Sequence, residues 1–202
     1  MSVDRGDFSF LNPYEDGAQP IGYRATISAP HIHAYALEAL QDHLKLGSRA
    51  LDVGSGSGYL TVCMALMVGS TGVAVGIEHI EELTKYALGN VDKWMKNSDA
   101  AKLAGIKVGK QLKLVTGDGR QGWKDDAPYD AIHVGASAPT IPNALKEQLK
   151  RGGRLICPVG PAGEVQDLLQ IDRLSDGSFQ NKSLKQVMFV LLTDKNLQLK
   201  PR

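Results

Sequence analysis

The segment 51–58, which reads LDVGSGSG, limits the possible folds of this chain more than any other stretch. A short apolar run leads into Asp52 and three glycines, and residues 59–67 then form an apolar segment. This order predicts a strand that turns directly into a helix, whose first backbone N–H groups are free to bind a ligand. Because the glycines lack side chains, a nucleotide-like ligand can approach the backbone closely.

The spacing of the acid and the glycines indicates which nucleotide-like ligand the loop would bind. Gly54, Gly56 and Gly58 are separated by one residue each, and Asp52 stands two residues before Gly54. In the dinucleotide-binding fingerprint the third glycine comes one residue later, and no acid is needed at the strand end. The spacing favours S-adenosylmethionine, whose cationic methionine portion suits an acidic strand end. A tight strand-to-helix turn without a ligand remains the alternative.

Apolar strand patterns and helical patterns alternate after residue 48. This alternation predicts an α/β fold, a doubly wound, mostly parallel sheet with helices on both faces. Residues 97–110 are expected to form a loop with some helix, and residues 166–174 and 185–192 an antiparallel strand pair at the sheet edge. The expected parallel strands are 49–53, 73–77, 111–116, 129–134 and 154–159, with helices at 59–67, 81–96 and 143–149.

The N-terminal part is expected to be an ordered but irregular arm, anchored by apolar side chains that include Phe8 and Phe10. Ser28 is expected to be the N-cap of a helix that has Pro30 in its first turn and runs to about Leu44. We expect one domain over residues 1–202, with three parts: the arm and its helix (1–47), a cofactor-binding core (48–165), and C-terminal strands with a lid (166–202). The inner face of the helix is predicted to carry Ile32, Tyr35, Ala36, Ala39, Leu40 and His43.

Composition excludes several classes of protein. A formal net charge of +1 gives no electrostatic signature of nucleic-acid binding. Cys63 and Cys157 have neither metal-site spacing nor a disulfide pattern, and their setting is typical of buried thiols in a reducing compartment. No stretch has transmembrane length, and the start does not read as a signal peptide. We therefore expect a cytosolic protein that does not bind membranes.

The ends of the later strands carry further candidate ligand contacts. Glu78 can accept hydrogen bonds from the hydroxyls of a ribose, and Asp118 from an adenine amino group, with Gly119 leaving room for the ring. A helix N-terminal acid and a turn-forming Asp are the respective alternatives. Arg120 is expected to form a structural ion pair. Residues 135–139 lack the Asn/Asp-Pro-Pro-aromatic run of methyltransferases that act on base amines, which argues against such an acceptor.

The rest of the chain carries more specific motifs. The strongest are AQPIG at residues 18–22 and ATISAPHIHA at residues 25–34. Over nearly its whole length the chain resembles the protein L-isoaspartate (D-aspartate) O-methyltransferases, repair enzymes that methylate damaged aspartyl residues. The other matching stretches are NPY at 12–14, the glycine loop, GDGR at 117–120, APYDAIHVGA at 127–136, GGRL at 152–155, PVGP at 158–161, and LTDK at 192–195 with Gln198.

The resemblance implies roles for individual residues. Ser28 is implied to be the catalytic residue, and Thr26 and Ser28 to orient the carboxylate of the substrate. It also implies a monomer that uses S-adenosylmethionine, releases S-adenosylhomocysteine and acts on isoaspartyl-containing proteins and peptides. The implied cofactor contacts are Ala25, Thr26, Ile27, Ser28, His33, Asp52, Gly54, Ser55, Gly56, Glu78, His79, Asp118, Gly119, Thr193 and Gln198.

Two features depart from the family pattern. Relatives usually have a further helical segment before the position that matches Asp4 and Arg5, and this sequence starts close to that point, which bears on stability and activity. Ser137 stands where many relatives have a small apolar residue, and we expect little effect from it.

The chemistry implied by the resemblance needs no general base, because a carboxylate is already ionised at pH 7. The sequence offers no obvious Asp/His or Cys/His pair at the site, in agreement with this mechanism. His31 and His33 are expected to point in different directions, and no metal site is expected. Three alternatives remain: a methyltransferase that acts on another carboxylate, an NAD-dependent oxidoreductase, and a non-catalytic cofactor-binding relative.

Overall fold

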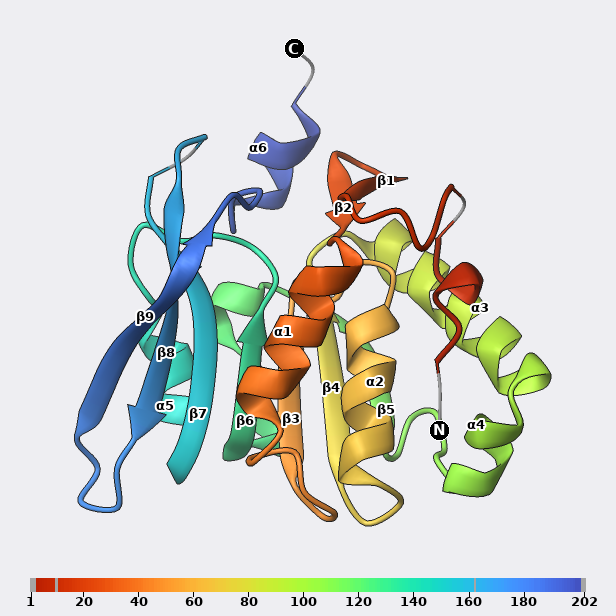
Figure 1. Ribbon diagram of the computed structural model, residues 1–202, viewed down its shortest axis with the longest axis horizontal. Coiled ribbons are helices and arrows are strands. Elements are labelled where there is room, and N and C mark those ends of the chain that lie inside the picture. Colours follow the sequence, from red (N-terminus) through yellow and green to blue (C-terminus); the bar gives the residue numbers. More distant parts are fainter. Residues whose placement is uncertain (1–2, 10, 162, 201–202) are drawn as a thin grey trace.

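Seven strands form one mixed sheet at the centre of the molecule (Figure 1). The computed structural model describes residues 3–9, 11–161 and 163–200. The strand order is β5-β4-β3-β6-β7-β8-β9; the first five strands in this order are parallel, and β8 and β9 run antiparallel to their neighbours. The predicted fold class is confirmed. The strands are β3 (Arg49–Val53), β4 (Val73–Glu78), β5 (Leu112–Thr116), β6 (Tyr129–Val134), β7 (Leu149–Val159), β8 (Gln166–Arg173) and β9 (Phe179–Val187).

Alternate residues of the central strands pack against two different layers. Ala50 belongs to a core cluster shared with α1 (Pro30–Leu40), α2 (Tyr59–Val68) and α3 (Glu81–Asn97). Leu51, the next residue, belongs to the cluster on the other face, together with Leu145 of α5 (Asn143–Gln148). This alternation follows from the two-residue period of a strand, so helices cover both faces as predicted.

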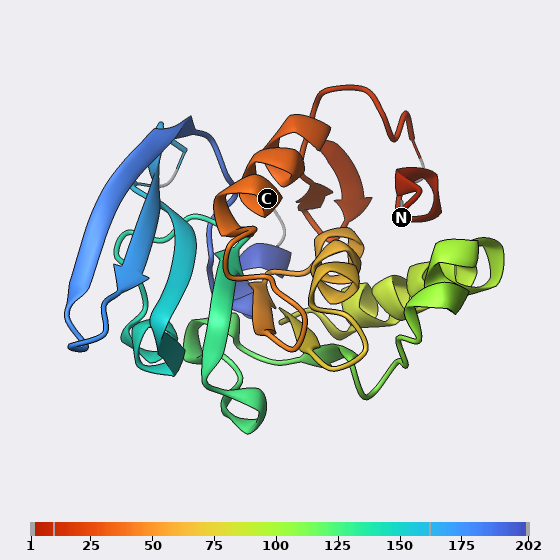
Figure 2. The same ribbon diagram turned by 60° about the horizontal axis from the view of Figure 1, so that its bottom comes forward.

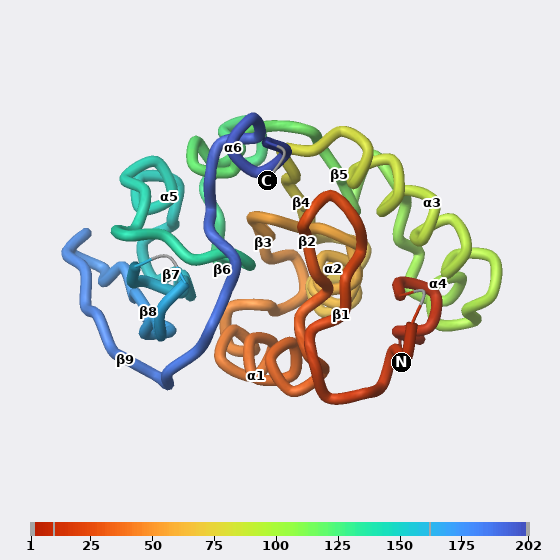
Figure 3. The backbone as a smooth tube through the Cα atoms, turned by 90° about the horizontal axis from the view of Figure 1, so that it is seen from above, coloured from red at the N-terminus to blue at the C-terminus, as the bar shows by residue number. Residues whose placement is uncertain are grey.

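The N-terminal arm contains more regular structure than the sequence predicts. The arm begins with the 3-10 turn η1 (Arg5–Asp7), which packs beside α3 (Figure 2). Further along the arm, β1 (Gln19–Gly22) and β2 (Ala25–Ile27) pair as a hairpin. Phe8 is buried as expected, whereas Phe10 lies outside the described residues. Viewed from above, the hairpin and α6 (Lys195–Leu199) lie over the end of the sheet where the parallel strands finish (Figure 3).

The predicted cap of α1 is wrong. The helix begins at Pro30 with Ala29 at the N-cap position, one residue later than a cap by Ser28 requires. The carboxylate of Asp16, from the preceding loop, instead accepts a hydrogen bond from the backbone N–H of His31 at 3.3 Å. The helix also ends at Leu40 and not at residue 44; of its predicted inner face, Ala36 and Leu40 are buried.

The boundaries of two strands, β7 and β9, also differ from the predictions. β7 begins at Leu149, five residues early, because Leu149 already pairs with Tyr129 across an irregularity in the ladder. Residues 97–110 contain the short helix α4 (Asp99–Ala104), as the prediction of a loop with some helix allows. β9 runs from Phe179 to Val187, where residues 185–192 were predicted, so it begins and ends earlier than expected and residues 188–192 leave the sheet. Among the described residues, no helix is long and apolar enough to cross a bilayer.

Candidate functional site

A pocket lies where four parallel strands end. Gly54 and Gly56 follow β3, Glu78 ends β4, Asp118 follows β5 and Gly135 follows β6, and all five line this pocket. β3 lies between β4 and β6, so the chain connections diverge on its two sides at this point. Open α/β sheets bind ligands at such a switch point, in the crevice beyond the carboxyl ends of the strands.

The glycine loop adopts a backbone conformation that favours glycine. Gly54, Gly56 and Gly58 have φ angles of +76°, +50° and +84°. The backbone N–H of Gly56 donates to the Glu78 carboxylate, with an N···Oε2 distance of 3.2 Å. A Cβ atom on Gly56 would lie 3.1 Å from Cδ1 of Ile21, so the hairpin approaches the loop closely. The loop is therefore held between β4 and the N-terminal hairpin.

The position of Glu78 is compatible with both roles that its place in the sequence allows. Its Oε1 accepts from the backbone N–H of Ile80 at 3.1 Å, just before α3 begins, as a helix N-terminal acid does. The same carboxylate lines the pocket and is 6% exposed. Each carboxylate oxygen has two lone pairs, so Glu78 can still accept hydrogen bonds from a ligand.

Asp118 lines the pocket and also forms the ion pair predicted for Arg120. Its Oδ1 accepts from the backbone N–H of Arg120 at 3.0 Å, and Nη2 of Arg120 lies 2.8 Å from Oδ2. The hydrogen bonds from the Arg120 side chain lower the pKa of Asp118, so the carboxylate is ionised at neutral pH. A Cβ atom on Gly119 would lie 2.5 Å from Cγ1 of Val53, so this glycine is also required for packing against β3.

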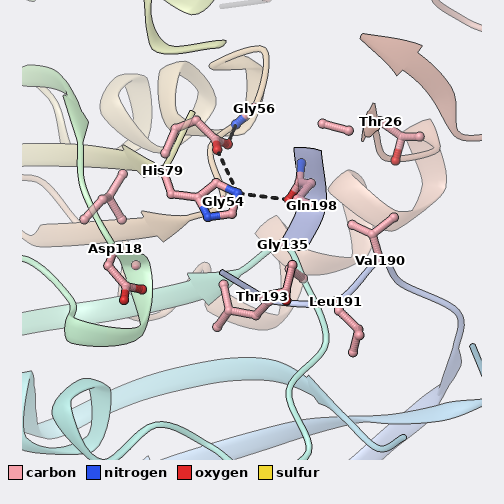
Figure 4. A pocket seen from close by; sticks show the side chains of 16 residues that line it. Thr26, Gly54, Gly56, His79, Asp118, Gly135, Val190, Leu191, Thr193 and Gln198 are labelled. Carbon is pink, nitrogen blue, oxygen red and sulfur yellow. Dashed lines mark hydrogen bonds and ion pairs between the residues drawn. The ribbon is translucent and has the colours of Figure 1, made fainter. Parts of the chain in front are cut away.

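Two hydrogen bonds link His79, Gln198 and Tyr23 beside the pocket. Nε2 of His79 lies 2.9 Å from Oε1 of Gln198 (Figure 4). Nε2 of Gln198 in turn donates to the carbonyl of Tyr23 at 2.9 Å. The carbonyl oxygen of Gln198 only accepts, so His79 carries a proton on Nε2. These hydrogen bonds join the end of β4, helix α6 and the turn of the hairpin. Thr193 and Ala25 line the same pocket.

Residues 190–192 line the pocket and were missed by the sequence analysis, which placed them in a strand. They leave β9 and pair with the segment after β6 instead: Ser137 N–H donates to the Val190 carbonyl at 2.8 Å, and Leu192 N–H to the Ser137 carbonyl at 2.7 Å. Ile77, Gly135 and Ala136 were also missed as pocket residues, although the strand-end cluster 135–139 was the signal that could have found the last two.

A smaller polar cavity adjoins this pocket. It shares Thr26, Gly54, Gly56 and Gly135 with the pocket. The cavity is also lined by the remaining predicted site residues, Ile27, Ser28, His33, Asp52 and Ser55.

A surface groove meets both hollows. It runs along residues 16–18 and 185–191, and it is lined as well by Thr26, Ser28 and Gly135. Thr26 therefore borders pocket, cavity and groove, and Ser28 borders the cavity and the groove. These two side chains stand where a small molecule in the pocket and a chain in the groove would meet.

The prediction that no Asp/His pair lies at the site is wrong. Nδ1 of His133 lies 2.8 Å from Oδ1 of Asp52, both side chains are buried, and both line the cavity. Oδ2 of Asp52 accepts from Oγ1 of Thr61 at 2.6 Å. The pair forms because the register of β3 and β6 sets Asp52 beside His133. Both oxygens of Asp52 are therefore already engaged within the protein.

His31 and His33 point in different directions, as expected. His31 is exposed and its Nδ1 lies 2.6 Å from Oδ1 of Asp16. His33 is buried, and Nη1 of Arg5 lies 2.8 Å from its Nδ1. Burial lowers the pKa of His33 well below its ordinary value, and the charges of Arg5 and His133 lower it further. Within the described residues, no group of three His, Cys, Asp or Glu side chains could hold a metal ion.

Comparison with known proteins decides the family. The family model described as protein-L-isoaspartate(D-aspartate) O-methyltransferase matches residues 1–197. The chain belongs to this family of isoaspartyl methyltransferases. It is 48% identical to the protein-L-isoaspartate O-methyltransferase of Caenorhabditis elegans over 98% of this chain and 84% of that protein. It is 53% identical to the enzyme of the same name from Triticum aestivum, over 98% of this chain and 83% of that protein.

A solved structure agrees with this family assignment. The chain is similar to a protein-L-isoaspartate O-methyltransferase from Plasmodium falciparum, crystallised in complex with S-adenosyl-L-homocysteine. The TM-score is 0.82 at 36% sequence identity, covering 95% of this chain and 86% of the other. The family recognised from the motifs at residues 18–34 is therefore confirmed, as is the class I methyltransferase fold.

Proposed function

We propose that this protein transfers a methyl group from S-adenosylmethionine to the free carboxylate of L-isoaspartyl and D-aspartyl residues in damaged proteins and peptides. The observation that carries the proposal is that pocket, cavity and groove meet at Thr26, while Ser28 lines both the cavity and the groove. A pocket at the strand ends suits a cofactor, and a groove along the surface suits a peptide. The residues between the two hollows would hold the carboxylate that accepts the methyl group.

The residues of the pocket fit S-adenosylmethionine. Glu78 and Asp118 offer carboxylate oxygens to ribose hydroxyls and to an adenine amino group, and the glycine loop offers backbone without side chains. His79, Thr193 and Gln198 would cover the cofactor, together with Ala25 of the hairpin. When bound, S-adenosylmethionine supplies an electrophilic methyl group attached to a sulfonium sulfur. Ile27, Ser28, His33, Asp52 and Ser55, which line the adjoining cavity, would surround its amino-acid end.

Thr26 and Ser28 would orient the acceptor carboxylate by hydrogen bonds from their hydroxyl groups. A hydroxyl donor holds an ionised carboxylate without neutralising it, whereas a Lys or Arg at the same place would lower its nucleophilicity. Correct placement of the reacting groups can lower the barrier by roughly 7–11 kcal/mol. The acceptor has no proton to lose, so the Asp52–His133 pair would have a structural and orienting role here. The ester product then loses methanol to give a succinimide, whose hydrolysis gives aspartate in part.

Several broader properties belong to the same proposal. We expect the protein to act as a monomer in the cytosol and to bind no nucleic acid. Both cysteines are free thiols, and burial raises the pKa of each to about 12, which suits a reducing compartment. The net charge of +1 offers little attraction to a polyanion.

The proposal is tested with S-adenosylmethionine labelled in its methyl group and a peptide that contains one isoaspartyl residue. We expect base-labile label on the peptide and, after repeated cycles, growth of the aspartyl form of the peptide at the expense of the isoaspartyl form. Label on the peptide that resists base would contradict the proposal. So would an unlabelled peptide, provided that the protein used is folded and binds S-adenosylhomocysteine. Methylation of small carboxylates at the rate of the peptide would favour the alternative of a different acceptor.

A further inference from the structure

Arg5 is an unusual residue in this molecule because its side chain is buried without an acidic partner. It is 1% exposed, and within the described part of the chain no carboxylate lies within ion-pair distance of its guanidinium. A buried charge is costly unless polar groups surround it. The groups that surround Arg5 therefore indicate what it does.

The guanidinium donates to three acceptors at once. Nε donates to the carbonyl of Pro13, Nη2 donates to the carbonyl of Ser28, and Nη1 lies 2.8 Å from Nδ1 of His33. The guanidinium also lies over the ring of Tyr59, 5.2 Å from its centroid. Two of these contacts, to Ser28 and His33, reach residues that line the cavity beside the pocket. Arg5 itself lies behind the wall of that cavity.

The contact with His33 determines where the imidazole carries its proton. All guanidinium nitrogens are donors, so Nδ1 of His33 must be the acceptor and cannot bear a hydrogen. The neutral ring then carries its proton on Nε2. Nδ1 is turned to Arg5, so Nε2 is the ring nitrogen left to donate a hydrogen bond into the cavity that His33 lines, and within the described residues no hydrogen bond of the protein engages it.

We propose that Arg5 is a positioning residue of the methyltransferase site, which fixes His33 as a neutral Nε2–H donor for a carboxylate oxygen in the cavity beside Ser28. The inference rests on the proposed function, because both molecules expected at this site carry a carboxylate. One is the methyl acceptor, and the other is the amino-acid end of the cofactor. By holding the Ser28 carbonyl as well, Arg5 ties the N-terminal turn to the residue proposed to touch the acceptor.

The surroundings of His33 keep its ring neutral over a wide range of pH. Four elements bring titratable or charged groups toward it: Arg5 from η1, Tyr59 from α2 at 5.2 Å between ring centroids, and the pair Asp52 and His133 from β3 and β6. Burial lowers the pKa of His33, and the neighbouring positive charges act in the same direction. The Asp52 carboxylate is already paired with His133.

The tautomer can be observed directly in the wild-type protein. Long-range ¹H–¹⁵N spectra of protein labelled at its histidines distinguish a protonated ring nitrogen from an unprotonated one, and His33→Gln assigns the signals. We expect His33 to keep an unprotonated Nδ1 and a protonated Nε2 from pH 8 to pH 5.5. A proton on Nδ1, or titration of His33 within this range, would overturn the proposal whether or not any variant folds.

Two variants test whether Arg5 acts through His33. We expect Arg5→Met to weaken carboxylate recognition roughly ten- to hundredfold, the range for a hydrogen bond to a charged group, and Arg5→Lys to recover part of the loss. In the His33→Gln background, where the amide can donate without help from Arg5, Arg5→Met should have a clearly smaller effect. Equal effects in the two backgrounds would overturn the proposal.

The source of the carboxylate is distinguished by binding measurements on the same variants. Weaker binding of S-adenosylhomocysteine, with unchanged binding of 5′-methylthioadenosine, which lacks the amino-acid end, would assign the contact to the cofactor. A raised KM for an isoaspartyl peptide, with unchanged affinity for S-adenosylhomocysteine, would assign it to the acceptor. If folded Arg5→Met changes neither quantity, the proposal is wrong. If wild-type protein binds S-adenosylhomocysteine but methylates no isoaspartyl peptide, the proposed function fails while the NMR result still stands.

Discussion

At the scale of single residues, the structure decides between the two roles that the sequence allows for Ser28, a helix cap and a residue of the active site. From the sequence, Ser28 could serve only as the N-cap of α1. The structure excludes this role, because Ala29 occupies the N-cap position and the helix has no side-chain cap there. Ser28 instead lines the cavity and the groove. Its proposed function therefore does not compete with a structural one.

We predict that Ser28→Ala loses most of its turnover while its affinity for S-adenosylhomocysteine stays within about threefold of wild type. The hydroxyl is proposed to orient the acceptor and not the cofactor, and losing one hydrogen bond to a charged group costs about 1.5–3 kcal/mol. Steady-state kinetics and calorimetry on the same preparation check this. A large loss of cofactor affinity would place Ser28 in the wall of the cofactor pocket only.

We predict that Glu78→Gln binds S-adenosylhomocysteine about tenfold more weakly. The amide has one acceptor oxygen where the carboxylate has two, and the backbone N–H groups of Gly56 and Ile80 already use both oxygens. Calorimetric titration measures the change, with Glu82→Gln as a control on the exposed first turn of α3. An unchanged affinity would mean that Glu78 serves only the loop and the helix.

The Asp52–His133 pair marks the limit of what residue patterns can predict. Both residues stand in recognisable motifs, at the end of one strand and within another. Their contact depends on the register of β3 and β6, which sets two residues 81 positions apart in the chain side by side. Register is a property of the assembled sheet, so no local spacing in the sequence indicates it.

At the scale of elements, the parallel strands were predictable because their apolar runs end at glycines or acids. The C-terminal strands were less predictable, and both ends of β9 differ from the prediction. Residues 185–192 are apolar enough to continue a strand, but Ser137 offers backbone partners that draw residues 190–192 out of the sheet. This competition between two tertiary partners brings residues 190–192 to the pocket.

We predict that Gly76→Ala lowers the free energy of unfolding by about 1–3 kcal/mol, the range for overpacking a core. A Cβ atom there would lie 2.6 Å from Oγ1 of Thr61, 2.8 Å from Cδ2 of Leu114 and 2.8 Å from Cβ of Ser55. Because Ser55 belongs to the glycine loop, cofactor affinity should fall as well. Urea denaturation and calorimetry measure the two effects.

Gly89→Ala is the matched control for this substitution. Gly89 lies inside α3, and an added Cβ would meet nothing within 4 Å. Alanine favours a helix over glycine, so this variant should be more stable by roughly 0.5–1 kcal/mol and should bind the cofactor normally. If both variants lose stability equally, close packing around Gly76 is not the cause.

At the scale of the whole molecule, we propose that the chain forms one domain. The N-terminal hairpin, the strand ends of the core and the C-terminal segment 190–198 all contribute to one pocket, and Gln198 joins two of them through Tyr23. Cofactor binding should therefore raise the stability of the whole chain in a single thermal transition. Separate transitions, of which only one shifts with S-adenosylhomocysteine, would contradict this organisation.

We predict that the melting temperature is lower at pH 5.5 than at pH 7.5. The pKa values of His33 and His43 are both lowered in the folded protein, chiefly by burial, whereas in the unfolded chain they lie near 6.5. As the pH falls below about 6.5 the unfolded state binds more protons than the folded state, so the free energy of unfolding decreases. The decrease should be smaller in His33→Gln, and an equal or larger decrease in that variant would assign the effect to other groups.

The central claim is that the pocket at the strand ends holds the methyl donor while the hairpin, Thr26 and Ser28 select the acceptor. The most direct test is the ratio of kcat/KM for two peptides of identical sequence, one with isoaspartate and one with aspartate at the same position. We predict a ratio of at least about one hundred, since the aspartyl peptide cannot place its carboxylate and its backbone in the same way. A ratio near one, with both peptides methylated, would contradict the account.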